Sequence, residues 1–253
     1  MFFVITILWV VGYFFIRASR HSDELRMKMA ERERLAVIGE MASVLAHEIR
    51  NPLGSIKGFA QYLKEQNTDN RTQSTDSLDI IVSESKRLEE LTEDLLMYAR
   101  PIEVGLQEFD IGELVNEIVT AINKSEGNAK RIDMKVFVPS ELNIKSDRDK
   151  LKQVMMNIIH NSMDAVDSDG IIEIKAENIN NKVTMTIKDN GCGMNKETRD
   201  NAFKPFFTTK TKGTGLGLAI VDKLTKSIGG EIKMESEPQK GTVFKIVMPK
   251  NFI

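Results

Sequence analysis

The chain has 253 residues, of which 41% are hydrophobic and 28% charged, and its formal net charge is −2. This composition is typical of a globular protein with room for one sizeable core or two small domains. The lack of a basic excess argues against nucleic-acid binding. The single cysteine, Cys192, excludes a disulfide within the chain.

Residues 1–16 carry no charged side chain, and Arg17, Arg20 and Lys28 follow them. As a helix this segment would be roughly 24 Å long, short of the roughly 30 Å hydrocarbon core of a bilayer. It lacks the basic leading region and small-residue cleavage site of a signal peptide. Basic residues on its carboxyl side place the remaining chain in the cytoplasm. We therefore expect a single-pass anchor in the cell inner membrane; the alternative is that residue 1 falls inside a longer membrane region.

A charged helical linker is expected over residues 17–32, followed by two amphipathic helices over residues 33–101. The apolar residues of the first helix, which ends near Glu65, recur at steps of three and four: Leu35, Ile38, Ala42, Leu45 and Ile49. Those of the second, which ends at Arg100-Pro101, are Ile81, Leu88, Leu91, Leu95 and Tyr98. A polar loop near residues 65–74 joins the helices into an antiparallel hairpin. Because a lone hairpin leaves its seam half exposed, we expect a homodimeric four-helix bundle with Leu45, Ile49, Leu88 and Leu95 in its core.

The first helix carries a histidine on its outer face. His47 lies away from the apolar stripe, with the carboxylate of Glu48 beside it. Asn51 lies one turn further along the same face, because residues four apart are helix neighbours. Pro52 follows and is expected to bend the helix locally. An exposed histidine next to a carboxylate suits a nucleophile that must meet bulky partners, although an isolated one is more often a solvated surface residue.

A second domain is expected over residues 106–250, with a different pattern. Helices are predicted over residues 111–124, 147–166 and 216–227. Strands are predicted near residues 133–138, 172–176, 183–187, 232–234 and 242–248, with Asn180-Asn181 as a hairpin turn. Helices and antiparallel strands in this order predict an α/β sandwich, with one sheet covered by helices on one face. The chain as a whole is thus predicted to be α+β.

Four polar or glycine-rich motifs fall in this second domain. Asn157, Asn161 and Asp164 form one polar stripe on the helix from Asp147, and amides flanked by apolar residues are costly unless they meet a polar ligand. The other three motifs are Asp189 to Met194, a carboxylate followed by Gly191 and Gly193; Phe203 to Lys210, an aromatic anchor before a basic segment; and Gly213 to Leu218, glycines at a helix start. Amide donors at a helix start bind anions well. Each motif alone is common in proteins without such a site. All of them in this order and spacing, after an exposed histidine on a helix, are not expected by coincidence.

With the histidine motif, these residues resemble the sensor histidine kinases of two-component signalling. His47 to Leu53 is similar to the phosphoacceptor box, Asn157 to Ala165 to the asparagine box, Asp189 to Met194 and Gly213 to Leu218 to the two glycine boxes, and Phe203 to Lys210 to the phenylalanine box. The sequence Pro-Phe-Phe-Thr-Thr-Lys resembles that of the subgroup containing the nitrogen-regulation and sporulation kinases. The resemblance covers about residues 33–250 and implies a dimerisation and phosphoacceptor hairpin followed by a Bergerat-type ATP-binding domain.

The resemblance also implies roles for individual residues. His47 would accept the γ-phosphoryl group of ATP, with Glu48 holding or deprotonating its ring, and would pass the group to an aspartate in the receiver domain of a response regulator. Asn51 would position water for removing phosphate from that regulator. Asp189 would bind the adenine amino group, with Gly191 and Gly193 close to the ring and Thr242 as a second contact. Asn161 would coordinate Mg²⁺, supported by Asn157. The phosphates would be surrounded by Lys210, Gly213, Gly215, Leu216 and Gly217.

Two departures and three alternatives bear on this interpretation. Many family members have lysine where Asp164 stands, so the charge facing the phosphates would come from Lys210 or Lys212. No sensor domain fits between residue 16 and the hairpin. The same ATP-binding fold serves chaperones, type II topoisomerases and mismatch-repair ATPases, but those use glutamate where Asn157 stands. A zinc peptidase would need a second histidine where Asn51 stands. A catalytically inactive dimeric scaffold is the remaining alternative.

Overall fold

The computed structural model describes residues 42–65, 71–125, 132–210 and 213–251, together with the single residues Trp9, Gly12, Tyr13, Arg17 and Gly39. The chain divides into two compact units, Met1–Ser85 and Lys86–Ile253. The expected membrane segment and linker lie almost entirely outside the described residues. Within the described part, no helix is both long and apolar enough to cross a membrane.

The predicted hairpin is present as helix α2, Ala42–Glu65, and helix α3, Arg71–Ala99. Helix α2 continues through Pro52, and helix α3 begins a few residues before the predicted end of the loop. Leu45 and Leu91 are buried, as expected of seam residues. Several other large apolar side chains of the two helices are exposed in the single chain, among them Leu53, Leu78, Val82 and Leu96. The hairpin therefore retains apolar surface beyond its own seam.

The carboxyl-terminal end of α3, which itself belongs to the second unit, is held by a lysine further along the same unit. The last carbonyl groups of a helix lack partners within the helix. Lys223 Nζ donates hydrogen bonds to the carbonyl oxygens of Met97 at 3.3 Å, of Tyr98, and of Arg100 at 3.0 Å. Pro101 follows and cannot continue the helix hydrogen-bonding pattern. These two features explain why α3 ends at Ala99.

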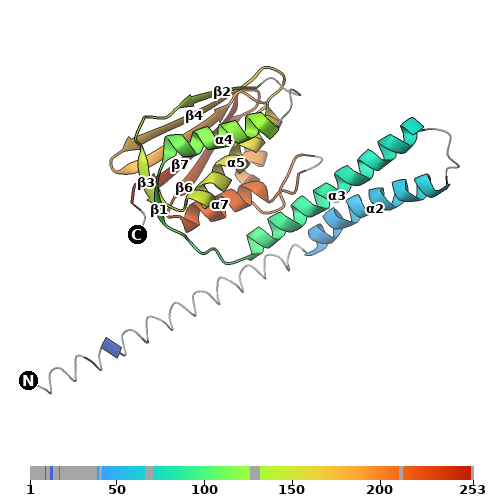
Figure 1. Ribbon diagram of the computed structural model, residues 1–253, viewed down its shortest axis with the longest axis horizontal. Helices are drawn as coiled ribbons and strands as arrows, with labels where there is room; N and C mark the ends of the chain where they lie inside the picture. The colour runs from blue at the N-terminus through green and yellow to red at the C-terminus, as the bar shows by residue number, and fades with distance from the viewer. Residues whose placement is uncertain are drawn as a thin grey trace, which may run out of the picture. The chain divides into compact units, whose positions relative to one another are not determined.

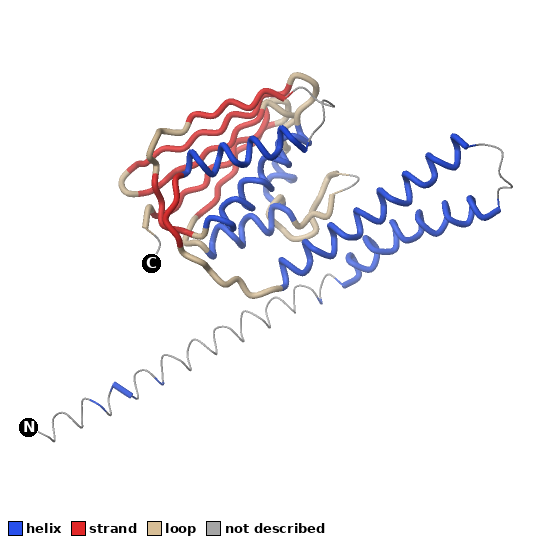
Figure 2. The backbone as a smooth tube through the Cα atoms, in the orientation of Figure 1, coloured by secondary structure: helices blue, strands red, loops and turns tan. Residues whose placement is uncertain are grey.

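The second unit contains a five-stranded sheet in the order β2-β4-β5-β7-β6, seen as the main layer of red strands in Figure 2. Its strands are β2 Ile132–Phe137, β4 Gly170–Ile179, β5 Lys182–Asp189, β6 Glu231–Glu237 and β7 Gly241–Pro249. A small antiparallel sheet pairs β1, Gln107–Asp110, with β3, Asn143–Ser146.

Three helices cover one face of the five-stranded sheet (Figure 1), as predicted. They are α4 Ile111–Ser125, α5 Arg148–Ala165 and α7 Gly217–Ser227. Helix α5 buries Leu151, Val154, Met155, Ile158 and Ile159. Each buried aliphatic side chain contributes about 1.5–3 kcal/mol to stability, so this apolar face fixes which side of α5 turns away from the sheet.

Helices α4 and α5 are also joined by ion pairs. Glu117 of α4 accepts from Lys152 at 2.5 Å and from Arg148, both on α5. These hydrogen bonds, that of Lys152 first, lower the pKa of Glu117 to about 2. The carboxylate therefore stays ionised, and the pairs intact, at any pH near neutrality.

The predicted sheet differs from the observed one in three respects. Strand β2 pairs parallel with β4, whereas only antiparallel strands were expected. Parallel neighbours need a long crossover connection, and α5 lies in that connection. The short strands β1 and β3 and the short helix α6, Lys196–Asn201, were not predicted. Four-residue strands and a six-residue helix are too short for periodicity to identify.

Candidate active site

The polar stripe predicted on α5 is present. Helix α5 starts at a capping residue, Asp147, whose side chain accepts from the Lys150 backbone N–H at 3.0 Å. Asn157 and Asn161 are half-buried and Asp164 is exposed, while the apolar side chains of the helix are buried. Packing of the apolar face thus leaves both amides partly exposed on another side of the helix.

Asp189, at the end of β5, is the buried carboxylate of the site, with 2% of its surface exposed. Its Oδ1 accepts from the backbone N–H of Gly191 and of Thr242, each at 3.0 Å, and its Oδ2 accepts from Ser162 Oγ at 3.1 Å. Burial raises the pKa of the Asp189 carboxyl, and these hydrogen bonds oppose the rise. Because a carboxylate oxygen can accept more than one hydrogen bond, Oδ2 can also accept from a ligand amino group.

The loop after Asp189 packs against the turn between β6 and β7. Gly193 has φ +64°, and a Cβ there would lie 2.0 Å from the Glu237 carbonyl oxygen. Only glycine fits here, because the backbone of the β6–β7 turn leaves no room for a side chain. The Gln239 backbone N–H donates to the Cys192 carbonyl at 2.7 Å and fixes the same contact.

Thr242 is buried beside Asp189. Its hydroxyl lies 3.0 Å from Ser236 Oγ, while its backbone N–H donates to Asp189. The structure therefore places Thr242 beside Asp189, where its N–H orients the carboxylate, and its contact with adenine stays a prediction.

The second glycine motif lies next to the asparagine stripe. A Cβ at Gly217, the first residue of α7, would be 3.9 Å from Asn161 Nδ2. Gly215 has φ +69°, and a Cβ there would lie 2.5 Å from the Phe206 carbonyl carbon, so glycine is required. Leu216 is buried and anchors the start of α7. Two motifs some fifty residues apart in the sequence thus meet at one helix start, where amide donors favour anions.

Lys210 places a positive charge on this site. Its Nζ donates to Asn161 Oδ1 and to Asp164 Oδ2, each at 2.8 Å. The Asn161 oxygen, predicted as the Mg²⁺ ligand, thus accepts a hydrogen bond from a cationic group. An uncharged amide oxygen of this kind suits Mg²⁺, which keeps few protein ligands. Lys212, the other candidate, lies outside the described residues.

Two contacts of the site were not predicted from the sequence. Ser162, inside the asparagine motif, is the side-chain partner of Asp189; its place on the helix face next to Asn161 could have indicated this. Asp94 of α3 accepts from Thr214 Oγ1 at 2.7 Å and so holds the second glycine motif. Burial raises the pKa of the Asp94 carboxyl, against the effect of the Thr214 hydrogen bond. Nothing in the charged sequence of α3 distinguishes Asp94.

In the other unit, His47 is exposed on α2, as predicted. The amide nitrogen of Asn51 lies 3.2 Å from its Nδ1, which confirms that the two side chains share one face. Glu48 is half-buried, and its action on the ring stays a prediction. Because Nδ1 faces Asn51, the Nε2 edge of the ring is the one turned away from this contact.

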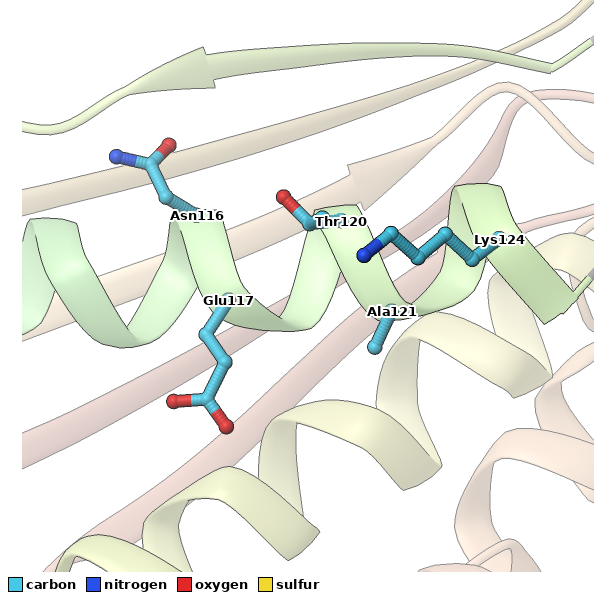
Figure 3. Close-up of a pocket in the computed structure, with 5 residues that line it drawn as sticks. All are labelled: Asn116, Glu117, Thr120, Ala121 and Lys124. Atoms are coloured by element: carbon cyan, nitrogen blue, oxygen red, sulfur yellow. The ribbon is translucent and has the colours of Figure 1, made fainter.

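A pocket elsewhere on the domain is separate from these residues. It lies along α4 and is lined by Asn116, Glu117, Thr120, Ala121 and Lys124 (Figure 3). None of these is among the predicted site residues, so this pocket does not bear on the nucleotide.

Comparison with known proteins agrees with this arrangement. Residues 37–103 match the family model of the His Kinase A (phospho-acceptor) domain, and residues 146–251 match the histidine kinase-, DNA gyrase B- and HSP90-like ATPase model. Sporulation kinase C of Bacillus subtilis is 36% identical over 228 residues, covering 89% of this chain and 52% of the relative. Signal transduction histidine-protein kinase AtoS of Escherichia coli is 35% identical, covering 90% and 37%. The chain therefore spans about half or less of these relatives.

Solved structures show the same fold. The histidine kinase ThkA, crystallised in complex with the response regulator protein TrrA, is 32% identical with a TM-score of 0.76, covering 87% of this chain and 64% of that one. The catalytic domain of ThkA alone is also 32% identical, with a TM-score of 0.53, and 97% of it is covered. With both domain models matched in order and the motif residues gathered as described, this chain belongs to the sensor histidine kinases of two-component signalling.

Proposed function

We propose that this chain phosphorylates itself on His47 from ATP and then passes the phosphoryl group to an aspartate of a response regulator. The observation that carries the proposal is the convergence of separate motifs in the second unit. Asp189 is built to accept a hydrogen bond from adenine, and Asn161, Lys210 and the start of α7 meet where phosphates would bind. The exposed His47 supplies the acceptor.

In the proposed reaction a ring nitrogen of His47 attacks the γ-phosphorus. An N–P bond forms as the P–O bond to the β-phosphate breaks, and ADP leaves with that electron pair. Glu48 takes up the ring proton, so that neutral imidazole presents a lone pair. Lys210 and the α7 amides offset charge on the phosphates, which is the main protein contribution to phosphoryl transfer. Mg²⁺, held through Asn161, would supply further charge neutralisation.

Asn157 argues against the hydrolytic alternative. It stands four residues before Asn161 on the same face of α5, where a water-activating base would be needed. An amide does not titrate and cannot act as a general base. The site therefore favours transfer to histidine over hydrolysis.

The proposal extends to assembly and location. The related kinase ThkA forms a complex with a response regulator, which supports a receiver domain as the partner here. The exposed Leu53, Leu78, Val82 and Leu96 give the hairpin apolar surface for a homodimer. Anchoring in the inner membrane through residues 1–16, with the rest cytoplasmic, completes the proposal.

Labelling with ATP tests the kinase proposal. We expect the protein with Mg²⁺ to acquire label from γ-labelled ATP and none from α-labelled ATP, because only the terminal group is transferred. Transfer of label from both, or from neither, would remove the proposed activity. Retained nucleotide binding without transfer would identify the inactive scaffold instead.

Asn51→Ala should separate kinase from phosphatase activity. The amide is predicted to position the water that removes phosphate from the regulator, so that rate should fall at least about tenfold. Its exposed contact with His47 contributes about 0.5–1.5 kcal/mol at most, so autophosphorylation should fall by a few-fold or less. Both rates are measured with purified regulator, and helix content is checked by circular dichroism. Equal losses in both rates would show that Asn51 acts on the helix or on His47 alone.

A further inference from the structure

The α5 stripe ends in a carboxylate, Asp164, which has no part in the proposed phosphoryl transfer. Asp164 Oδ2 lies 2.8 Å from Lys210 Nζ, and the same Nζ lies 2.8 Å from Asn161 Oδ1. The two acceptors are on successive turns of one helix face, and the lysine comes from a segment 46 residues further along the chain. Two oxygens from α5 thus converge on one ammonium group.

Stability does not explain this contact. The Lys210 and Asp164 side chains are 40% and 63% exposed, and exposed ion pairs contribute little to stability. A free lysine side chain samples many rotamers, so without a partner its charge would be spread over many positions. What the contact does is place the ammonium beside Asn161.

The backbone supports the same placement. The Lys210 N–H donates to Thr208 Oγ1 at 3.1 Å. A Cβ at Gly213 would lie 2.8 Å from that same Thr208 hydroxyl oxygen. The Thr208 hydroxyl therefore lies against both the Lys210 backbone and Gly213, which brings the start of the glycine motif close to the lysine.

The ammonium keeps capacity for a ligand. It has three N–H donors, of which Asn161 and Asp164 take two. The third can be given to an anion, and the start of α7 with its amide donors lies beside Asn161. Lys210 is thus presented to the place where the glycine motif would hold a phosphate.

We propose that Asp164 is a positioning residue, which holds the Lys210 ammonium beside Asn161 so that its remaining donor meets the phosphate tail of the nucleotide. This rests on the proposed function, because it takes the site to bind ATP. The positioning role predicts a change in nucleotide affinity opposite in direction to the one that simple electrostatics predicts. Removing a carboxylate near phosphates should by itself strengthen binding, whereas removing a positioning carboxylate should weaken it.

A double-mutant cycle decides between the two. The dissociation constant of a non-hydrolysable ATP analogue with Mg²⁺ is measured for the wild type, Asp164→Ala, Lys210→Ala and the double variant. We expect Asp164→Ala to weaken binding about 3- to 10-fold in the wild-type background, and to leave it unchanged or strengthen it when Lys210 is already alanine. Asp167→Ala removes an exposed carboxylate just past the end of α5, and should change binding by less than twofold.

AMP, which lacks the outer phosphates, provides a second readout. Its binding should respond to Asp164→Ala by less than twofold, because the adenine end of the site is untouched. Unchanged or tighter analogue binding in Asp164→Ala, or an equal loss in both backgrounds, would overturn the positioning role while leaving the proposed function standing. If the wild type bound neither analogue nor AMP, the proposed function itself would fail and this inference with it.

Discussion

Asp189→Asn is expected to weaken ADP binding on the order of 100-fold while the domain remains folded. The two side chains have the same shape, and the amide oxygen can still accept from Gly191 and Thr242. The amide nitrogen, in place of Oδ2, can donate to Ser162 Oγ. Toward the adenine amino group, however, an acceptor has become a donor. Facing two donors costs about 2–3 kcal/mol, or roughly 30- to 150-fold in affinity.

The direction in which this substitution changes stability can also be predicted. Burial raises the pKa of Asp189 in the folded protein, so stability is lost as the pH rises through that pKa and the carboxyl ionises. A neutral amide avoids this loss. Asp189→Asn should therefore unfold no more easily than the wild type at neutral pH.

Calorimetric titration with ADP and with IDP checks both points. The 6-oxo group of hypoxanthine accepts where the adenine amino group donates, so the Asn variant should lose most of the preference for ADP over IDP. Thermal unfolding serves as the control for folding. Unchanged ADP affinity with unchanged base preference would show that Asp189 does not contact the base.

Asn161→Asp should reduce autophosphorylation more than 100-fold. The amide oxygen already accepts from Lys210, and a carboxylate there would join Asp164 in binding the same ammonium. Two carboxylates would then outweigh the positive charge of the lysine and repel the triphosphate. Because Asn161 is only half-buried, the packing of α5 should not change.

Asn116→Asp makes the same chemical change on the exposed face of α4 and should retain full activity. The rate of label incorporation and the affinity for the ATP analogue are compared for the two variants. Wild-type values in Asn161→Asp would remove this residue from the site. A loss shared by Asn116→Asp would point to a general effect of added charge.

The helices could be predicted from the sequence because their apolar residues recur at helical spacing. Leu151, Val154 and Ile158 define the buried face of α5, and the amides of the site follow as its complement. In strands β4 and β5, apolar and polar residues alternate on either side of Asn180-Asn181, and both asparagines adopt positive φ. The local periodicity of apolar residues thus predicts the helices and strands that carry the site.

Contacts between distant segments could not be predicted in this way. The parallel pairing of β2 with β4 depends on the path of α5, and the hydrogen bond from Thr214 to Asp94 joins residues 120 positions apart. The motifs of the sequence include both Lys210 and Asp164, but their spacing does not predict that the two side chains pair. Such contacts depend on tertiary packing, which the spacing of residues along the chain does not predict.

The central claim is that His47 carries the phosphoryl group, and the chemistry of the labelled protein tests it most directly. After incubation with γ-labelled ATP and Mg²⁺, we expect label that is lost in acid and kept in base, as for a phosphoramidate. It should be absent from His47→Gln and present in His21→Gln and His160→Gln, the other two histidines of the chain. Normal labelling of His47→Gln, or an acid-stable label, would contradict the account.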